Sequence, residues 1–438
     1  MEVKEPVAKY LARPALKQTE AGLIPEDWEV KRLGSVSTVV RGGSPRPAGD
    51  PRYFDGAFIP WLTVASLTNI PASQLVVSET ATCLTEEGAQ HSRTLVPGTV
   101  IIANSGATLG VAKILGVKCC ANDGIAALQA LAKGVSSNYV VHYINTRTQH
   151  LREVVATGNG QPNLNTGLLS GLALPLPPTL GEQQAITAAL TDADALIEAL
   201  EQLLAKKRRI KQGAMQELLT GQKRLPGFAG EWAVKSMGEL FEFSGGFTAS
   251  RDQLGEDGYC YLHYGDIHGS SKAYIDVRAE FQEIPKLDIH LKRIGRASIL
   301  DDGDVVFVDA SEDDEGTSKH VVIVNSEGVP FIAGLHTIVA KSKTDEMDNR
   351  YKRYCFQSAS VKAQFRYFAV GTKVSGISKT NIGKITISFP SLEEQTAIAA
   401  VLSDMDAEIA AIEAKLAKAR GVKLGMMQEL LTGRIRLV

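Results

Sequence analysis

The chain contains one long helix-like stretch twice, and this repeat limits what it can fold into. Residues 180–225 read LGEQQAITAALTDADALIEALEQLLAKKRRIKQGAMQELLTGQKRL, and residues 392–437 read LEEQTAIAAVLSDMDAEIAAIEAKLAKARGVKLGMMQELLTGRIRL. With a shift of about 212 positions, roughly 28 of the 46 residues are identical without a gap, far more than two unrelated helices would share. The chain therefore contains a duplicated helix.

Both copies carry the same signals for a helix start and a helix end. Each starts with a proline, a hydroxyl residue and a glutamate, which predicts a capping box in which hydroxyl and carboxylate each satisfy a free backbone amide. Each ends at a glycine, where a helix favours a left-handed residue. These positions are Pro178, Thr179, Glu182 and Gly221 in the first copy, and Pro390, Ser391, Glu394 and Gly433 in the second.

Apolar residues recur in both copies at heptad spacing, which predicts a coiled-coil seam. Lys211 and Lys423 interrupt this pattern at the same position of each copy, and Gly213 and Gly425 follow them. We expect the two helices to face each other and to approach closely or bend there; the alternative is two amphipathic helices on separate cores. The expected seam consists of Ile186, Leu190, Ile197, Leu204, Ile398, Leu402, Ile409 and Leu416.

Composition excludes several classes of protein. The 438 residues suffice for two or three domains, and the apolar fraction of 44% is that of an ordinary globular protein. No apolar run approaches the roughly 18 residues of a membrane span, and the N-terminus lacks a signal peptide's apolar centre, so we expect a cytoplasmic protein without membrane contact. Five cysteines without CxxC spacing predict reduced, mostly buried thiols. The net charge of −2 gives no global argument for nucleic acid, so any DNA binding must rest on local patches.

The segments outside the long helices repeat as well, but more weakly. A tryptophan (Trp28, Trp232), a Val-Lys pair, a glycine and a Gly-Gly pair recur in the same order, followed by similar β-branched runs. We predict an α+β fold: two tandem β-rich domains separated by two long helices that form an antiparallel coiled coil, related by a pseudo-two-fold. The expected parts are a tail or short helix at 1–22, the first domain at 23–178, the first helix at 179–222, the second domain at 223–390 and the second helix at 391–438.

A search for catalytic and metal motifs identifies no site. The chain has no GxxxxGK[ST] loop, no GxGxxG in a βαβ context and neither of the loops that mark a DNA methyltransferase. Cys260, His263 and His268 lie close together but lack a fourth zinc ligand, so we assign them to a strand and its loop. The acidic run at 312–315 is either a solvated loop or a cation site, or supplies an acceptor for a cytosine amino group. We therefore predict neither catalytic residues nor a metal site.

This organisation resembles the specificity subunits of type I restriction-modification systems. The resemblance covers nearly the whole chain and rests on the Trp-Val-Lys-Gly openings, the Gly-Gly loops, the P-x-x-x-E-Q helix starts and the duplicated ELLTG ends. It implies a non-catalytic subunit in which each domain reads one half of a split, asymmetric sequence in double-stranded DNA. It also implies that the helices dock two methyltransferase subunits, that restriction and translocase subunits join the complex, and that S-adenosylmethionine, ATP and Mg act in the partners.

Polar loop residues of the two domains are our candidates for DNA contact. They are inferred from loop position, since the resemblance carries no matched reading residues. In the first domain they are Arg41, Ser44, Arg46, Thr63, Ser66, Ser105, Thr108, Gln161, Asn163 and Asn165. In the second they are Thr248, Ser250, Arg251, His263, Tyr264, Asp266, His268, Lys373, Ser375, Ser378 and Lys379.

Three alternatives stay open at this point. The basic run at 206–211 either touches DNA phosphates, meets an acidic partner helix or forms a solvated face. The chain as a whole is alternatively a protein-binding scaffold or adaptor of a multisubunit defence complex. A self-contained modifying enzyme is the third class, and it requires cofactor binding by the isolated chain.

Overall fold

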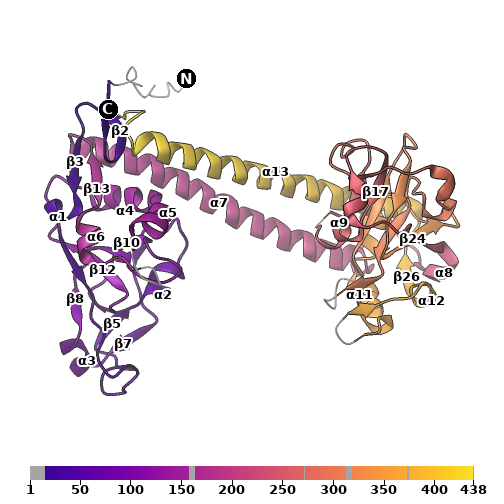
Figure 1. Cartoon of the computed structure of the whole chain (residues 1–438). Helices are drawn as coiled ribbons and strands as arrows, with labels where there is room; N and C mark the ends of the chain where they lie inside the picture. Colours follow the sequence, from indigo (N-terminus) through magenta and orange to yellow (C-terminus); the bar gives the residue numbers. More distant parts are fainter. Residues whose placement is uncertain (1–14, 157–162, 271, 312–317, 372–373, 438) are drawn as a thin grey trace, which may run out of the picture. The chain divides into compact units, whose positions relative to one another are not determined.

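The computed structural model describes residues 15–156, 163–270, 272–311, 318–371 and 374–437 (Figure 1). The chain divides into two compact units, which are described here one at a time. Unit 1 contains Met1–Leu203 and Glu413–Val438, and unit 2 contains Leu204–Ile412. Each unit therefore takes segments from both repeats. Among the described helices, none combines the length and the apolar character needed to cross a membrane.

Unit 1 is built on two mixed sheets. The larger has the strand order β4-β12-β9-β10-β6 and the smaller β7-β5-β11-β8, while β1 pairs with β2 and β3 with β13. The strands are β1 (Leu16–Thr19), β2 (Gly22–Pro25), β3 (Glu29–Arg32), β4 (Thr38–Arg41), β5 (Ile59–Leu62), β6 (Val76–Val77), β7 (Thr82–Leu84), β8 (Arg93–Leu95), β9 (Val100–Ala103), β10 (Ala112–Leu115), β11 (Cys119–Ala121), β12 (Ile125–Gln129) and β13 (Ala173–Leu176). The described part of the segment expected to be a tail or short helix is thus a β-hairpin, in which Leu16 pairs with Pro25.

Short helices join these strands. They are α1 (Leu33–Val36), α2 (Val64–Thr68), α3 (Glu86–Gln90), α4 (Ser137–Thr146), α5 (Thr148–His150), η1 (Leu151–Val155) and α6 (Thr166–Ser170). The main core of unit 1 lies between one face of the larger sheet, α4 and the long helices, and it includes Trp28, Ile102 and Tyr139. All four residues of β9 are buried because this strand is covered on both faces.

Unit 2 repeats this plan. Its larger sheet has the order β15-β24-β20-β22-β18 and its smaller sheet β16-β19-β17-β23, while β14 pairs with β26 and β21 with β25. The strands are β14 (Ala233–Ser236), β15 (Phe241–Gly245), β16 (Leu254–Gly255), β17 (Tyr259–Leu262), β18 (Tyr274–Asp276), β19 (Lys286–Leu287), β20 (Val305–Val308), β21 (Ala310–Ser311), β22 (His320–Val324), β23 (Phe331–Ala333), β24 (Thr337–Ser342), β25 (Ser375–Gly376) and β26 (Thr386–Phe389). The helices are α8 (Met237–Leu240), η2 (Arg251–Gln253), α9 (Tyr264–His268), η3 (Leu291–Arg293), η4 (Arg296–Ser298), α10 (Lys352–Cys355), α11 (Ala359–Phe368) and α12 (Lys379–Ile382).

The two larger sheets correspond strand by strand, including the direction of each pairing. In unit 1 the edge strand β6 is parallel to β10 while the other neighbours are antiparallel, and in unit 2 β18 is parallel to β22 in the same way. The smaller sheets share the parallel pairs β5 with β11 and β17 with β23. This common topology confirms the predicted α+β class with two tandem β-rich domains.

The long helices are α7 (Leu180–Leu218) and α13 (Leu392–Leu430), of 39 residues each. At a rise of about 1.5 Å per residue each is about 58 Å long. They run side by side in opposite directions within each unit (Figure 1), because in unit 1 Asp194 pairs with Lys423 and Glu201 with Arg420. In unit 2, Lys211 pairs with Asp406 and Lys207 with Glu408. The antiparallel coiled coil is therefore present in both units.

The expected seam residues are buried with one exception, and they divide between two roles. Ile186, Leu190, Ile398 and Leu402 pack into the cores of the β-rich domains, whereas Ile197, Leu204 and Leu416 are buried outside these two cores. Ile409 is half-buried, and its neighbour Ile412 is buried instead. The first turns of each helix thus belong to a domain core.

The glutamine of each P-x-x-x-E-Q start binds the helix to its domain. Gln183 donates to the carbonyl oxygen of Gly134 at 3.0 Å and accepts from the Ser136 amide at 2.9 Å. Gln395 repeats this arrangement in unit 2, where it accepts from the Asp348 amide and donates to the Glu346 carbonyl oxygen, both at 2.9 Å. Both side chains are buried, so the motif fixes how each helix leaves its domain.

The predicted capping boxes are wrong in their carboxylate half, which the glutamates next to these glutamines were expected to supply. The hydroxyl half is present, since Thr179 and Ser391 accept from the amides of Glu182 and Glu394. The carboxylates, however, bind arginines: Glu182 pairs with Arg436 and Glu394 with Arg224. A guanidinium offers two parallel donors to a buried carboxylate, which a single backbone amide does not.

The glycines give one confirmation and one correction. Gly221 and Gly433 have φ values of 70° and 69°, as expected for left-handed residues at helix ends. The prediction that the two helices approach each other closely at Gly213 and Gly425 is wrong, because an added Cβ would meet nothing within 4 Å at either position. Lys211 and Lys423 break the apolar seam because each forms an ion pair there.

Candidate nucleic-acid interface

Three of the candidate residues of unit 1 converge on Asp123. Ser44 donates to its Oδ1 at 2.6 Å, Arg46 Nη2 donates to Oδ2 at 3.3 Å, and Arg41 Nε donates to its backbone oxygen at 2.6 Å. The hydrogen bond from Ser44 lowers the pKa of Asp123, aided by the charges of Arg46 and Arg41 and opposed by partial burial. The loop after β4 and the turn between β11 and β12 therefore form one polar, charged cluster at the end of the larger sheet.

The Gly-Gly pairs exist so that the loop after the first strand of the larger sheet can pass close to that turn. A Cβ on Gly42 would lie 2.0 Å from the carbonyl oxygen of Asn122, and one on Gly246 would lie 1.7 Å from that of Gly334. Such distances leave room for hydrogen alone. The same close approach in both units places corresponding loops at corresponding sheet ends.

Two further candidates of unit 1 border this cluster. Ser105 forms an isolated antiparallel bridge with Asn163, directly beside Asn104. Asn104 is buried, and its amide nitrogen donates to the Asp123 backbone oxygen at 3.2 Å. Thr108 lies further along the same loop and is half-buried.

The remaining described candidates of unit 1 have local structural roles. Thr63 and Ser66 form the capping box of α2, and Asn165 caps α6 by accepting from the Leu168 amide at 2.8 Å. Polar residues commonly have this role at helix starts. Gln161 lies outside the described residues.

In unit 2 the corresponding region holds a cluster around Arg251. Arg251 Nη2 donates to Asp266 Oδ1 at 2.9 Å and lies 3.2 Å from His263 Nδ1, which also accepts from the Gly265 amide at 3.1 Å. Two donors on Nδ1 place the imidazole proton on Nε2, so His263 is neutral. Burial lowers the pKa of His263, and the charge of Arg251 lowers it further against the effect of Asp266.

Aromatic and imidazole rings line a cavity of about 400 Å³ next to this cluster. The Tyr264 ring lies 4.7 Å from that of His263 and 5.6 Å from that of His336. His268 Nε2 lies 2.7 Å from Ser311 Oγ on another wall. Exposed ring faces and nitrogen donors of this kind suit contact with base edges.

The other candidates of unit 2 lie outside the cluster around Arg251. Ser250 caps η2 and Ser378 caps α12, while Thr248 is exposed. Ser375 lies on β25, opposite Ser311, in the position that the Asn163 bridge has in unit 1. Lys379 extends beside Gly245, with Nζ 3.3 Å from where a Cβ would lie. Lys373 and the acidic run at 312–315 lie outside the described residues.

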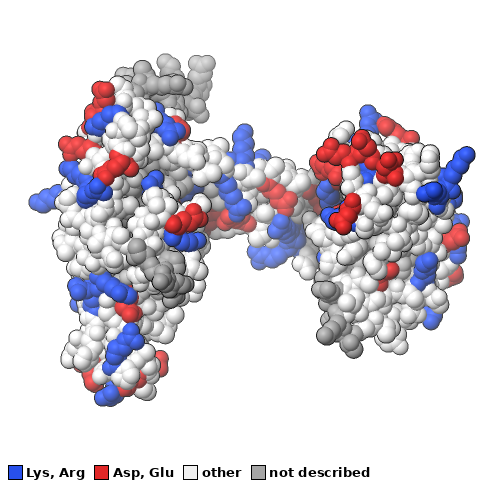
Figure 2. All heavy atoms as spheres, in the orientation of Figure 1, with Lys and Arg blue, Asp and Glu red and all other residues white. Residues whose placement is uncertain are grey.

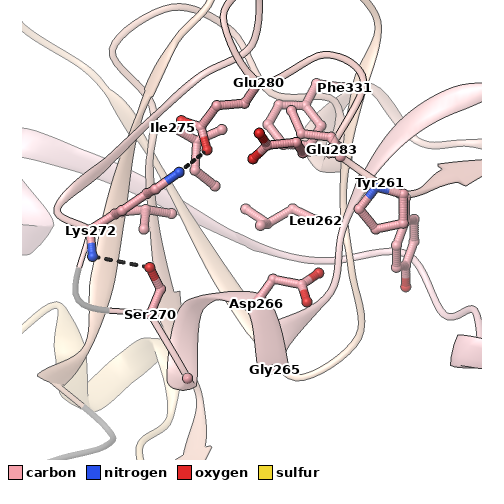
Figure 3. Close-up of a pocket in the computed structure, with 14 residues that line it drawn as sticks. Tyr261, Leu262, Gly265, Asp266, Ser270, Lys272, Ile275, Glu280, Glu283 and Phe331 are labelled. Atoms are coloured by element: carbon pink, nitrogen blue, oxygen red, sulfur yellow. Dashed lines mark hydrogen bonds and ion pairs between the residues drawn. The ribbon is translucent and has the colours of Figure 1, made fainter. Parts of the chain in front are cut away.

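A second cavity of unit 2, of about 480 Å³, is lined partly by apolar side chains such as Phe331 (Figure 3). Lys272 forms an ion pair with Glu280 at its wall. Glu283 and Asp266 also line it, so carboxylates outnumber the ammonium group. An acidic lining repels phosphate, and this cavity is therefore unsuited to the DNA backbone.

Lys and Arg lie next to Asp and Glu over much of the face seen in Figure 2, on both units and along the helices, although Asp and Glu gather at the upper part of unit 2. The basic run of α7 follows this rule, since Lys207 and Lys211 pair with Glu408 and Asp406 of α13. Two of its members thus meet an acidic partner helix, one of the alternatives considered for the run.

The zinc combination considered from the sequence is not assembled. Cys260 is buried in β17, and His263 Nδ1 is engaged with Arg251 and the Gly265 amide. Within the described residues, no group of three or more His, Cys, Asp or Glu side chains is arranged to hold a metal ion. All five cysteines are unpaired thiols, four of them buried.

Several residues that form these contacts were missed from the sequence. Asp123 lies in the tight turn Asn122-Asp123-Gly124 between two apolar strands, a signal that predicts a turn but not the arginines that reach it. Asp194 and Asp406 recur at the same shift as Lys423 and Lys211, and this paired recurrence could have identified both ion pairs.

Comparison with known proteins gives a consistent result. The family model described as type I restriction modification DNA specificity domain matches residues 25–208 and 229–419. The type I restriction enzyme MjaVIII specificity subunit of Methanocaldococcus jannaschii is 22% identical over 98% of each chain, and the putative MjaX specificity subunit of the same organism is 24% identical over 96% of each. Among solved structures, the S subunit of a type I restriction-modification system from M. genitalium aligns over 96% of this chain and 99% of its own, with 13% identity and a TM-score of 0.55. A chain from a study of complex assembly in a type I system aligns over 94% of this chain and 99% of its own, with 16% identity and a TM-score of 0.60.

Proposed function

The chain belongs to the type I restriction-modification DNA specificity family, and on this premise we propose that each of its β-rich domains reads one half of a bipartite, asymmetric DNA target. It is a DNA-recognition specificity subunit, and subunits of this family are not catalytic. One observation carries the proposal: the two units share one topology but have different charged pairs at corresponding sheet ends. These pairs are Arg46 with Asp123 in unit 1 and Arg251 with Asp266 in unit 2.

The difference between these two clusters supports an asymmetric target. Phosphate contacts position a protein on DNA, whereas side chains at base edges specify sequence. Topology and helix attachments are repeated in the two units, but the polar side chains at the sheet ends are not. Two such readers recognise two different half-sites.

DNA and the modification and restriction subunits are the partners of a type I specificity subunit, and we infer that two methyltransferase subunits bind this chain. The supporting observation is that the start of one long helix is joined to the segment after the other by the same kind of ion pair in both units. These ion pairs are Glu182 with Arg436 in unit 1 and Glu394 with Arg224 in unit 2. Two equivalent surfaces fit two copies of one partner. S-adenosylmethionine, ATP and Mg then act in the partner subunits. Because its target is DNA, we place the complex in the cytoplasm of its host.

A domain exchange combined with methylome sequencing tests the proposal. The chain is co-expressed with the methyltransferase subunit of its system, and methylated positions are mapped across the host genome. We expect one bipartite motif, and replacing residues 24–178 by those of another family member should alter one half of it. Absence of sequence-dependent methylation, or alteration of both halves, would contradict the proposal.

The alternative function, a protein-binding scaffold of a defence complex, predicts a different result in a simpler measurement. The complex with its methyltransferase is titrated with duplex DNA at low salt, where phosphate contacts are strongest. A scaffold would leave the DNA affinity of the methyltransferase unchanged. A specificity subunit raises that affinity for DNA that contains the motif.

A further inference from the structure

We propose that the end of α11 and the start of α12 in unit 2 form a surface that binds DNA phosphates, and that unit 1 lacks this surface. The surface consists of Arg366, Tyr367 and Lys379. This inference rests on the proposed function and adds which of the two domains holds the DNA backbone. Unit 2 then supplies affinity that does not depend on sequence, whereas unit 1 selects bases with little of it.

The charges of the second domain are unevenly divided along its sequence. Residues 226–348 contain 11 Lys and Arg against 23 Asp and Glu, whereas residues 349–390 contain eight Lys and Arg and no Asp or Glu. Asp and Glu gather at the upper part of unit 2 in Figure 2, whereas α11 and α12 lie at its lower part in Figure 1. A domain with a net negative charge therefore has a locally positive segment, which attracts anions.

Two cations of this segment are exposed and form no ion pair. Arg366 and Lys379 are both exposed, and within the described part of unit 2 no carboxylate pairs with either side chain. Other exposed cations of the unit are neutralised by a neighbour, as Arg278 is by Glu327 at 2.8 Å. The charges of Arg366 and Lys379 are therefore available to an anionic ligand.

The two cations belong to elements that are joined to each other. Asn381 Nδ2 on α12 donates to the carbonyl oxygen of Phe368, the last residue of α11, at 3.3 Å. Arg366 lies two residues before Phe368, and Lys379 lies two residues before Asn381. Tyr367, next to Arg366, is 81% exposed, and a tyrosine hydroxyl is a further donor to phosphate oxygens.

This surface borders the side chains that face a base in the proposed function. Lys379 Nζ lies 3.3 Å from where a Cβ of Gly245, in the Gly-Gly loop, would lie. Val374, in the segment between α11 and α12, lines the aromatic cavity together with Tyr264 and His336. The major groove is about 12 Å wide, so cations beside a base-reading cavity reach the phosphates at the rim of the groove. This position favours DNA over an acidic protein as the ligand.

Unit 1 contains the same two helix ends, which allows the positions to be compared. The helix before the segment ends at the C-cap Ala156 in unit 1 and Ala369 in unit 2, with a ψ of 140° at both. The next helix starts at the N-cap Asn165 in unit 1 and Ser378 in unit 2. The two caps are nine residues apart in each unit, so the segments align without a gap.

In this alignment unit 1 lacks both cations. Glu153 has the position of Arg366, and Thr166 has the position of Lys379. A carboxylate repels phosphate, and a threonine carries no charge to attract it. The contact is therefore specific to unit 2, although the elements that would carry it are present twice.

The test measures how salt affects DNA binding by the intact complex with its methyltransferase. One duplex contains the methylated motif and a second duplex of equal length lacks it. Arg366→Gln combined with Lys379→Gln should make the slope of log affinity against log salt concentration shallower by about 2, because two phosphate contacts are lost. The loss of affinity should therefore be about 10-fold larger at 50 mM than at 200 mM salt, and equal for the two duplexes. The methylated motif should not change.

The matched control removes two exposed cations at the opposite end of the sheet. Lys343→Gln combined with Arg350→Gln changes the net charge by the same amount. Both residues follow Ser342, which pairs with Phe241 at the end of β15 opposite to Gly245. The salt slope of this variant should equal that of the unaltered complex. Thermal unfolding and size-exclusion chromatography verify that each variant is folded and binds the methyltransferase.

Three results would overturn the inference while leaving the proposed function intact. The salt slope of the Arg366→Gln and Lys379→Gln variant could stay unchanged, or its loss of affinity could be confined to the duplex with the motif. The folded variant could also fail to bind the methyltransferase, which would assign the surface to that partner instead of DNA. Absence of DNA binding by the unaltered complex would instead refute the proposed function itself.

Discussion

The ammonium group of Lys423 on α13 lies 2.5 Å from the carboxylate of Asp194 on α7. The same pair recurs with the halves exchanged, as Lys211 with Asp406 in unit 2. The surroundings differ, since the Asp194 side chain is 7% exposed and that of Asp406 is 43% exposed. The same lysine–aspartate ion pair therefore occurs twice, with a buried aspartate in unit 1 and a half-exposed aspartate in unit 2.

Lys423→Met is expected to destabilise unit 1 by about 3 to 5 kcal/mol, because it leaves the Asp194 carboxylate buried without its partner. Lys211→Met should cost about 1 kcal/mol or less, because water reaches Asp406 and Tyr354 donates to its Oδ2 at 2.8 Å. Peptide-resolved hydrogen exchange measures the loss in each unit separately, which matters because a chain of two units need not unfold in one step.

The matched control replaces both partners in unit 1. Lys423→Met combined with Asp194→Leu removes the buried charge along with its partner and should recover most of the lost stability. Equal losses for Lys423→Met and Lys211→Met would show that burial of the aspartate does not decide the cost.

The sequence predicted the long helices well because repetition and local signals reinforce each other there. The heptad pattern located most of the seam, and the terminal glycines have the expected left-handed backbone. The partner of Glu182 could not be predicted, because Arg436 is far from it in sequence and meets it only when the helices pack antiparallel.

Gly213→Ala and Gly425→Ala are expected to stabilise the chain, by up to about 1 kcal/mol each. Alanine is the better helix former, and a Cβ at either position would meet open space. Gly433→Ala should destabilise instead by about 1 to 2 kcal/mol or more, because φ is positive and the Cβ would lie 2.6 Å from Pro25 and 2.9 Å from Trp28. Shifts of the thermal midpoint check all three. Destabilisation by Gly213→Ala would restore the idea that the helices need close approach there.

His142 is expected to make unit 1 less stable in acid. Burial lowers its pKa to about 4, the charge of Lys423 lowers it too, and Asp194 opposes this. Between pH 6.5 and 4 the unfolded chain therefore binds a proton that folded His142 does not. The free energy of unfolding should fall as the pH drops through this window, by up to about 3 kcal/mol at pH 4.

His142→Gln removes this titration, so its unfolding free energy should depend less on pH between 6.5 and 4 than that of the unaltered chain. Unit 2 contains its own buried histidine, His320, whose pKa burial also lowers to about 4. Amides of unit 2 should therefore keep their pH dependence in the His142→Gln variant. The prediction would be contradicted if the unfolding free energy of unit 1 changed equally with pH in the His142→Gln variant and in the unaltered chain.

The candidate site was predicted in outline from loop position, but not in its chemistry. Arg46 and Arg251 were named because they follow the Gly-Gly pairs, and both lie at the sheet ends that the structure brings together. Thr63 and Asn165 were equally plausible in sequence yet cap helices. Single-sequence reasoning cannot separate these roles, because a polar loop residue that caps a helix has the same local sequence as one that faces a ligand.

Lengthening both long helices is expected to widen the unread spacer between the half-sites. The stretch around residues 216–221 is unsuitable for an insertion, because Leu218 and Leu219 are buried in unit 2 and Gly221 packs on Trp232. The insertion belongs where neither domain core is involved: a copy of residues 197–203 after Leu203 and a copy of residues 406–412 after Ile412. Seven residues keep the heptad phase and add about 10 Å, which corresponds to about 3 base pairs.

Methylome sequencing of the complex with the lengthened subunit measures this directly. Both half-sites should remain as in the unaltered complex, while the spacer grows by about 3 base pairs. The control lengthens α7 alone, so that the pair of Asp194 with Lys423 in unit 1 and the pair of Lys211 with Asp406 in unit 2 can no longer form together. This change should abolish specific methylation. An unchanged spacer in the doubly lengthened subunit would mean that helix length does not set the distance between the half-sites, and an altered half-site would mean that the helices also take part in reading bases.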